Sequence, residues 1–115
     1  MLSMKDTTLI SQARDALLKC LQEVPFVKVE VLKESKRLAS ASDLRLLVKT
    51  PGDKRTLVVE VKSVGQPRVV REALNQLARS KEQCPDAYGV IMAPYISPEA
   101  AGICRQEGVG FADLA

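Results

Sequence analysis

The stretch DLRLLVKTPGDKRTLVVEVKS, residues 43–63, decides the fold. It contains two mainly apolar runs, 43–49 and 56–63, on either side of Pro51-Gly52-Asp53. These turn residues are typical of a tight reversal, because proline fixes φ and glycine accepts positive φ. The stretch therefore predicts a β-hairpin of two antiparallel strands.

The pairing of these two strands decides which side chains meet. With the turn centred between its glycine and its aspartate, Asp43 lies opposite Lys62 and Arg45 lies opposite Glu60. Side chains alternate between the faces of a sheet, so Asp43, Glu60 and Lys62 are all expected on one face. The diagonal separation of the two acidic residues is then roughly 7–8 Å.

These three charged side chains interrupt strands that are otherwise strongly apolar, at the carboxyl end of the 56–63 strand. Open α/β sheets bind their ligands at the carboxyl ends of strands. Two nearby carboxylates can share one hard cation. Phosphodiester hydrolysis needs a metal that polarises the phosphate and activates water, with a further cation to stabilise charge. The pattern therefore indicates a metal-dependent phosphodiesterase site.

Hydrophobic periodicity predicts the elements on either side of the hairpin. The predicted order is α-β-β-β-α-β-α-β, an α/β fold with a mixed β-sheet flanked by helices on both faces, whose strand-helix-strand unit is a right-handed parallel crossover. The predicted ranges are a helix over 9–21, a strand over 27–32, a polar loop over 33–42, the hairpin, a helix opened by 65–67, a strand over 88–92, a helix capped by Ser97 that stops at Gly108, and a strand over 109–114.

Composition narrows the possible chemistry. The chain has no histidine, which excludes Ser-His-Asp triads, Cys-His dyads and metal sites with two histidines. Cys20, Cys84 and Cys104 are widely spaced and are expected to be reduced core residues. The net charge of +3 mildly favours a polyanionic partner.

The 115 residues suit a single domain, 1–115, with no internal repeat or linker. The chain ends directly after its last predicted strand, so we expect a domain truncated at its C-terminus. No apolar run approaches the length of a membrane span and no secretion signal opens the chain, so no membrane contact and a cytoplasmic location are expected.

The motif of Asp43, a hairpin and then Glu60-Val61-Lys62 resembles the Asp…(Asp/Glu)-x-Lys signature of the PD-(D/E)XK nuclease superfamily, which has the restriction endonuclease-like fold. The following helix contains Gln76, similar to the helical glutamine of many members. Further along, GVIMAPYISPEA (89–100) and GVGFADL (108–114) resemble the tail of Mrr-like type IV restriction domains.

This resemblance implies roles for individual residues. Asp43 and Glu60 would bind Mg²⁺ or Mn²⁺ with the Val61 carbonyl as a third ligand, Lys62 would position the attacking water, and Gln76 would support the site. The chain departs from the family pattern at two positions. Ser42 stands where a proline is common, and Gln12 stands where the first helix often carries an acidic residue, with Asp15 offset by one turn.

The resemblance predicts a Mg-dependent endodeoxyribonuclease of restriction or repair type. Its DNA partner would contact Lys36 and Arg37 in the loop before Asp43, and Arg68 and Arg71 on the second helix. An ordinary charged helix surface is an equally simple interpretation of the two arginines. A homodimer is expected, because cutting two strands needs two sites and the chain has one.

Two alternative functions fit the same pattern. The first is a nucleic-acid-binding module with a decayed nuclease site, which would bind DNA with a steep salt dependence and show no turnover. The second is a non-catalytic interaction domain of a larger protein, which would dock through the sheet edge left bare at the C-terminus.

Overall fold

A computed structural model of the chain describes residues 4–32 and 43–114. The predicted order α-β-β-β-α-β-α-β is confirmed. The elements are α1 (Met4–Gln22), β1 (Lys28–Val31), β2 (Leu44–Thr50), β3 (Asp53–Val61), α2 (Pro67–Gln83), β4 (Tyr88–Ala93), α3 (Pro98–Gln106) and β5 (Gly110–Asp113). Lys36 and Arg37, in the predicted loop over 33–42, lie outside the described residues.

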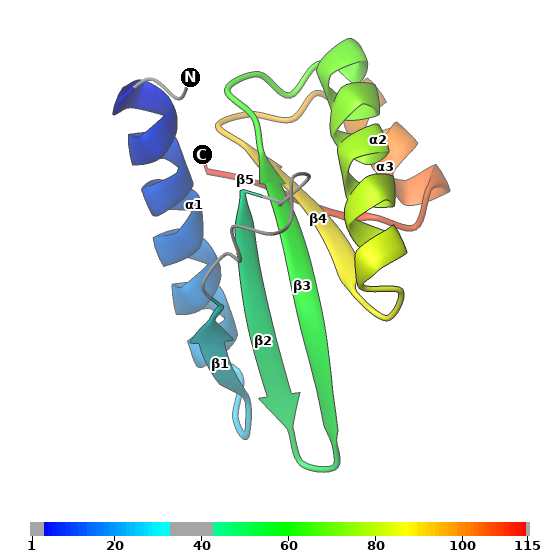
Figure 1. The fold of residues 1–115 in the computed structure, drawn as a ribbon. Coiled ribbons are helices and arrows are strands. Elements are labelled where there is room, and N and C mark those ends of the chain that lie inside the picture. The colour runs from blue at the N-terminus through cyan, green and yellow to red at the C-terminus, as the bar shows by residue number, and fades with distance from the viewer. Residues whose placement is uncertain (1–3, 33–42, 115) are drawn as a thin grey trace.

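The five strands form one mixed sheet in the order β1-β2-β3-β4-β5. The pairs β1–β2 and β2–β3 are antiparallel, whereas β3–β4 and β4–β5 are parallel. Helix α1 covers one face, and α2 and α3 cover the other (Figure 1). This is the predicted sheet with helices on both faces. In the described part of the chain, no helix is long and apolar enough to cross a membrane.

Side-chain alternation along β3 feeds two separate cores. Val58 packs with α2 and α3 residues such as Val70, Leu77 and Cys104. Val59 and Val61 pack with Ala13 of α1 and with residues of β2 and β4. Each face of the strand therefore buries apolar surface, as expected for the central strand of a covered sheet.

The helix starts follow local chemistry. The Ser97 hydroxyl accepts a hydrogen bond from the Ala100 N–H at 3.1 Å, and Pro98 occupies the first helical position, as predicted for α3. Gly108, with φ of +67°, lies just beyond its end. The first strand is shorter than predicted, since β1 covers only Lys28–Val31.

The hairpin turn lies one residue earlier than predicted. Thr50 pairs with Asp53, so Pro51 and Gly52 form the turn, and Gly52 has φ of +87°. Proline at the first corner and glycine with positive φ at the second are the preferences of a type II turn. The fixed φ of proline and the positive φ of glycine therefore place the turn at Pro51-Gly52, and not between Gly52 and Asp53 as predicted.

This turn corrects the predicted pairing. Arg45 lies opposite Val58 and not opposite Glu60, and the register does not bring Asp43 opposite Lys62. The pairing differs from the prediction by two residues along the partner strand. Because side chains repeat every two residues, the shift leaves each side chain on its predicted face.

The loops after β3 and β4 run together at the carboxyl ends of these strands. Gly65 bridges to Ile96, and its carbonyl accepts a hydrogen bond from the Ser97 N–H at 3.0 Å. A side chain at Gly65 would collide with the carbonyl oxygen of Tyr95. This close approach holds the starts of α2 and α3 beside the end of β3.

The connection from α1 to β1 contains one backbone outlier. Phe26 has φ of +65°, and 84% of the residue is exposed. Left-handed backbone costs about 1–2 kcal/mol for a residue that carries a Cβ. An exposed aromatic side chain recovers little of this through burial.

Candidate active site

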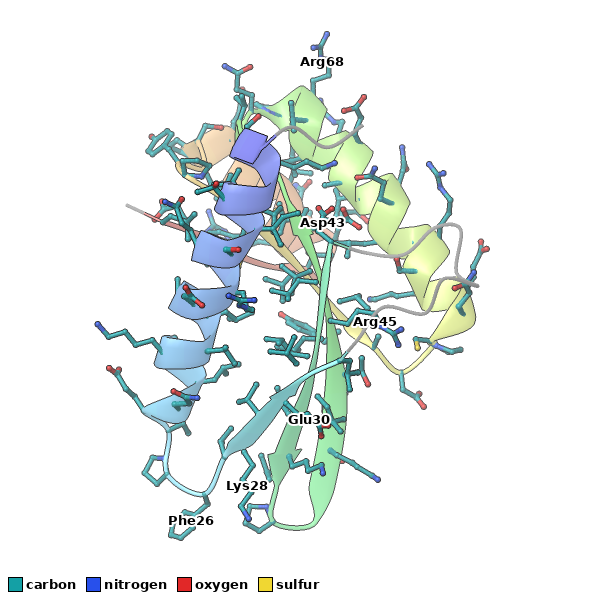
Figure 2. All side chains as sticks on the ribbon, turned by 60° about the vertical axis from the view of Figure 1, so that its left-hand side comes forward. Phe26, Lys28, Glu30, Asp43, Arg45 and Arg68 are labelled. Atoms are coloured by element: carbon teal, nitrogen blue, oxygen red, sulfur yellow. The ribbon has the colours of Figure 1, made fainter. Side chains whose placement is uncertain are left out.

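Asp43 lies beside the end of β3. The β2–β3 ladder pairs Leu44 with Val59, and extending it by one residue places Asp43 directly opposite Glu60. The Asp43 Oδ2 atom accepts a hydrogen bond from the Val61 N–H at 2.8 Å. Figure 2 shows Asp43 near one end of the strand pair, well away from Phe26 and Lys28 at the other end.

The backbone directions show how closely the two acids approach. The Val61 N–H points toward β2, so the N–H of the preceding Glu60 points toward β4. Asp43 and Glu60 are therefore a non-hydrogen-bonded pair, for which the Cα separation is about 4.5 Å. The carboxylates are directly opposite, closer than the diagonal that the predicted register implied.

Glu60 is buried, with only 4% of the residue exposed. It lies on the same sheet face as Val58, the face that α2 covers. A carboxylate is rarely this buried unless a partner or ligand compensates for the lost water. An ionisable group therefore occupies a core position at the carboxyl end of β3, where an apolar side chain would otherwise pack.

Lys62 continues the line of β3 beyond the strand's last residue. Its N–H donates to the Met92 carbonyl at 2.8 Å, which keeps the backbone extended beside β4. By alternation its half-buried side chain shares the face of Glu60. The structure thus brings Asp43, Glu60 and Lys62 to one face at one strand end, as predicted from the sequence.

Val61 contributes through its backbone, because its side chain is buried toward α1. In an extended strand, the N–H and C=O of one residue point to the same side. The Val61 N–H points to Asp43, so its carbonyl oxygen points to that side too. A third oxygen donor therefore lies beside the two carboxylates.

Gln76 lies on α2, next to the buried face of the helix that Ala73, Leu77 and Ser80 form. Its Oε1 atom is buried and has no hydrogen-bond donor among the described residues. An unsatisfied buried acceptor costs about 1–3 kcal/mol. A bound ligand, or an ordered water held by that ligand, would supply the missing hydrogen-bond donor.

Arg45 was given no role by the sequence, yet it shares the face of Asp43. Its Nη2 atom donates to the Sγ atom of Cys84 at 3.3 Å, at the C-terminal end of α2. A cation at a helix C-terminus interacts favourably with the helix dipole. The signal available in the sequence was the spacing of two residues from Asp43, which puts both side chains on one face.

The predicted DNA contacts on α2 are exposed. Arg68 and Arg71 both lie on the solvent side of the helix. Figure 2 shows Arg68 projecting outward from the start of α2, away from Asp43. The structure therefore does not gather them with the acids, and their contact with DNA stays a prediction.

Gln12 reaches the end of β3 from the other face of the sheet. It lines an open hollow of about 510 Å³ together with Thr8, Leu9, Ser63 and Pro94. Asp15 is exposed and pairs with Arg14 at 3.3 Å. Helix α1 therefore presents an amide at this position. Within residues 4–32 and 43–114, no group of three or more His, Cys, Asp or Glu side chains is arranged to hold a metal.

Comparison with known proteins adds information at the level of the fold. No protein-family profile matches the chain, and no curated protein sequence matches it. Among solved structures, it is similar to a repair endonuclease from Pyrococcus abyssi, at 15% identity and a TM-score of 0.60 over 90% of this chain and 45% of that one.

Two structures of EndoMS are also similar. The apo form has 20% identity and a TM-score of 0.54, covering 89% of this chain and 45% of that one. The complex with double-stranded DNA has 19% identity and a TM-score of 0.55, covering 100% of this chain and 48% of that one. The chain thus spans less than half the length of these proteins.

The expected likeness to Mrr-like restriction domains is not confirmed by these comparisons. At such identities, the similarity shows a common fold and no more. The described residues thus form an α/β domain that shares the fold of these solved structures, in line with the restriction endonuclease-like fold expected from the sequence.

Proposed function

We propose that this chain is the catalytic domain of a metal-dependent DNA endonuclease that hydrolyses phosphodiester bonds. The observation that carries the proposal is the direct pairing of Asp43 with the buried Glu60, with Lys62 on the same face at the strand end. The fold is shared with a protein described as a repair endonuclease and with EndoMS, of which one structure holds double-stranded DNA.

The donor set suits a hard divalent cation. Asp43 and Glu60 offer carboxylate oxygens and Val61 offers a carbonyl oxygen, the ligands that Mg²⁺ and Mn²⁺ prefer. Mg²⁺ commonly takes one or two carboxylates and completes its shell with waters and phosphate oxygens, so two acids are sufficient. When bound, the metal would polarise the phosphate and lower the pKa of a coordinated water.

The remaining roles belong to the chain's own side chains. The Lys62 ammonium group would hold the attacking water and stabilise charge that develops on the phosphate. The unsatisfied Gln76 Oε1 atom would accept a hydrogen bond from that lysine or from an ordered water, and so orient it. Water adds to phosphorus, one P–O bond breaks, and the products are an alcohol and a phosphomonoester.

We also propose that the protein acts on DNA as a homodimer. Each chain offers one set of Asp43, Glu60 and Lys62, so cleavage of both strands of a duplex requires two copies. Sedimentation velocity of the protein with a duplex would detect two copies per DNA. A 1:1 complex that cuts both strands would contradict this assembly.

The decisive experiment is nicking of a supercoiled plasmid with Mg²⁺, Mn²⁺ or EDTA. Glu60→Gln should lower the rate about 10²-fold or more, in the range of a lost catalytic group. Glu72→Gln makes the same chemical change at an exposed position of α2 and should leave the rate within about twofold of wild type. Calorimetry with Mn²⁺ should show binding to wild type and to Glu72→Gln, and weak binding to Glu60→Gln.

The outcome separates the alternatives. Wild-type protein that binds DNA with a steep salt dependence but cleaves nothing with either metal would be a binding module with a decayed site. Protein that binds neither metal nor DNA would be an interaction domain. Either result would overturn the nuclease proposal.

A further inference from the structure

Three lysines form a row across the sheet. The register pairs Lys28 of β1 with Lys49 of β2, and Lys49 with Lys54 of β3. Residues directly opposite in antiparallel strands share a face, with Cβ atoms about 4.5–5.5 Å apart. All three side chains are exposed. The "lysine row", as we call Lys28, Lys49 and Lys54, thus concentrates three ammonium groups on neighbouring strands.

The lysine row shares its sheet face with the candidate active site. Lys49 follows Asp43 by six residues and Lys54 precedes Glu60 by six, so alternation puts all four on one face. At about 3.4 Å per residue, the row and the acid pair are about 20 Å apart. Arg45 lies between them on the same face. Helix α2 packs beside β3 and β4, so among the described elements no helix covers β1 and β2 on this face (Figure 1).

The opposed lysines of the row repel one another. Like charges directly opposite each other destabilise a sheet. Within the described residues, the row has a single ion-pair partner, because Lys49 Nζ lies 3.9 Å from Glu30 Oε2 and both groups are exposed. In the described part of the chain, no ion pair therefore neutralises Lys28 or Lys54, and the pair at Lys49 is exposed.

An exposed aromatic side chain adjoins the row. Phe26, Lys28 and Lys49 line the same hollow of about 500 Å³, with Val27, Thr50 and Pro51. Phe26 is 84% exposed and is held at φ of +65°, a conformation that does not suit a residue with a side chain. Figure 2 shows Phe26 and Lys28 together at the end of the sheet opposite Asp43.

We propose that the lysine row and Phe26 form a second nucleic-acid contact, which holds the substrate strand about 20 Å from the cleavage centre. The lysines bind backbone phosphates, and Phe26 stacks on an unpaired base. Cations beside an exposed aromatic are how proteins hold single strands without reading sequence. The span corresponds to about six nucleotides at the 3.4 Å rise of a helical strand. This inference rests on the proposed nuclease function and names where that substrate is held.

The first test removes the charges of the row. Fluorescence anisotropy would follow a labelled single-stranded 12-mer DNA in EDTA, where no cleavage occurs, over a range of KCl concentrations. K28Q/K49Q/K54Q should weaken binding about 10-fold or more at low salt and lower the slope of log K against log[salt] by about 2, since each lost phosphate contact on a single strand contributes about 0.7.

The matched control is R14Q/K19Q/R55Q. It removes three charges from α1 and from the α1 side of β3, so the net charge falls equally. Its slope should equal that of wild type. Thermal melting checks folding, and the row variant should melt no lower than wild type because it loses repulsion. Equal slopes for the two triple variants would overturn the inference.

The second test isolates stacking. Phe26→Ala should weaken binding of the 12-mer about 5- to 100-fold without changing the salt slope, whereas Phe26→Tyr should retain wild-type affinity. Wild-type affinity for Phe26→Ala would overturn the stacking contact. Polyglutamate that competes as well as DNA per charge would identify an acidic protein as the partner and overturn the nucleic-acid assignment.

The two proposals fail in distinguishable ways. If wild type cleaves DNA and the row variant keeps its affinity and slope, only the second contact is lost. If the row variant loses slope while wild type cleaves nothing with Mg²⁺ or Mn²⁺, the nuclease proposal falls and the nucleic-acid contact stands.

Discussion

The two ends of the β2–β3 hairpin carry opposite charges on one sheet face. At the acid end, Asp43 and Glu60 are directly paired, Glu60 is 4% exposed, and a backbone hydrogen bond holds Asp43. At the other end, all three lysines of the lysine row are exposed to solvent. Charge withdrawn from water requires compensating partners, whereas exposed charge is screened and tolerated. Substitutions at the acid end should therefore change cleavage rate or stability strongly. Substitutions at the lysine end should change stability and DNA binding by smaller amounts.

The largest contrast is between the aspartates of the two ends. Both accept a backbone hydrogen bond, Asp43 from Val61 at 2.8 Å and Asp53 from Lys54 at 2.9 Å. An asparagine preserves that acceptor and removes the charge. Asp43→Asn should lower metal-dependent cleavage about 10²-fold or more, and Asp53→Asn should stay within about twofold, measured as initial rates at saturating metal. Equal loss in both variants would show that the charge of Asp43 is not special.

The next contrast uses the glycines of the two ends. Gly65→Ala places a Cβ against the Tyr95 carbonyl, and relief requires the paired loops to separate. We expect a loss of about 3 kcal/mol in the free energy of unfolding, as for severe overpacking. Gly52→Ala meets nothing within 4 Å but must adopt φ of +87°, for a loss of about 1 kcal/mol. Urea unfolding curves measure both, and a larger loss at Gly52 would contradict the ranking.

A smaller effect, of opposite sign, is expected at Phe26. Phe26→Gly relieves the left-handed strain of about 1–2 kcal/mol and adds chain entropy to the unfolded state. The net result should be about 0.5–1 kcal/mol of added stability, together with weaker DNA binding. Phe26→Ala keeps the strain, so its stability should not rise. If glycine and alanine variants unfold at the same urea concentration, strain does not explain the backbone at this residue.

The smallest effect concerns the lysine row in the protein without DNA. Each opposed like-charge pair destabilises a sheet by about 0.2–1 kcal/mol. K28Q/K49Q/K54Q should therefore raise the melting temperature slightly at low ionic strength. The gain should vanish near 1 M salt, where the screening length is about 3 Å. A gain that persists in high salt would mean that something other than repulsion changed.

Part of the candidate site was predictable because it depends only on side-chain alternation. Asp43, Glu60 and Lys62 were placed on one face from a register that was wrong by two residues along the partner strand. Their common face survived because the side-chain period is also two. The roles of these residues as metal ligands and catalytic groups remain predictions.

The direct opposition of Asp43 and Glu60 could not be predicted from the sequence, because it depends on which residues form the turn. The choice of Pro51 and Gly52 moved every partner along the ladder. The orphaned Gln76 oxygen and the contact of Arg45 with Cys84 required knowledge of how α2 lies on the sheet. Such contacts join segments far apart in the chain, where local patterns carry no information.

What the sequence by itself determined is the order of elements and the face of each strand residue. Hydrophobic period, turn residues and caps are local, and backbone geometry converts them directly into helices, strands and alternating side chains. Only the tertiary structure decided that Lys28 joins Lys49 and Lys54, since no local sequence signal sets the register of β1 against β2. Neighbours across strands are set by the packing of the whole sheet, which minimises exposed apolar surface and unpaired backbone groups together.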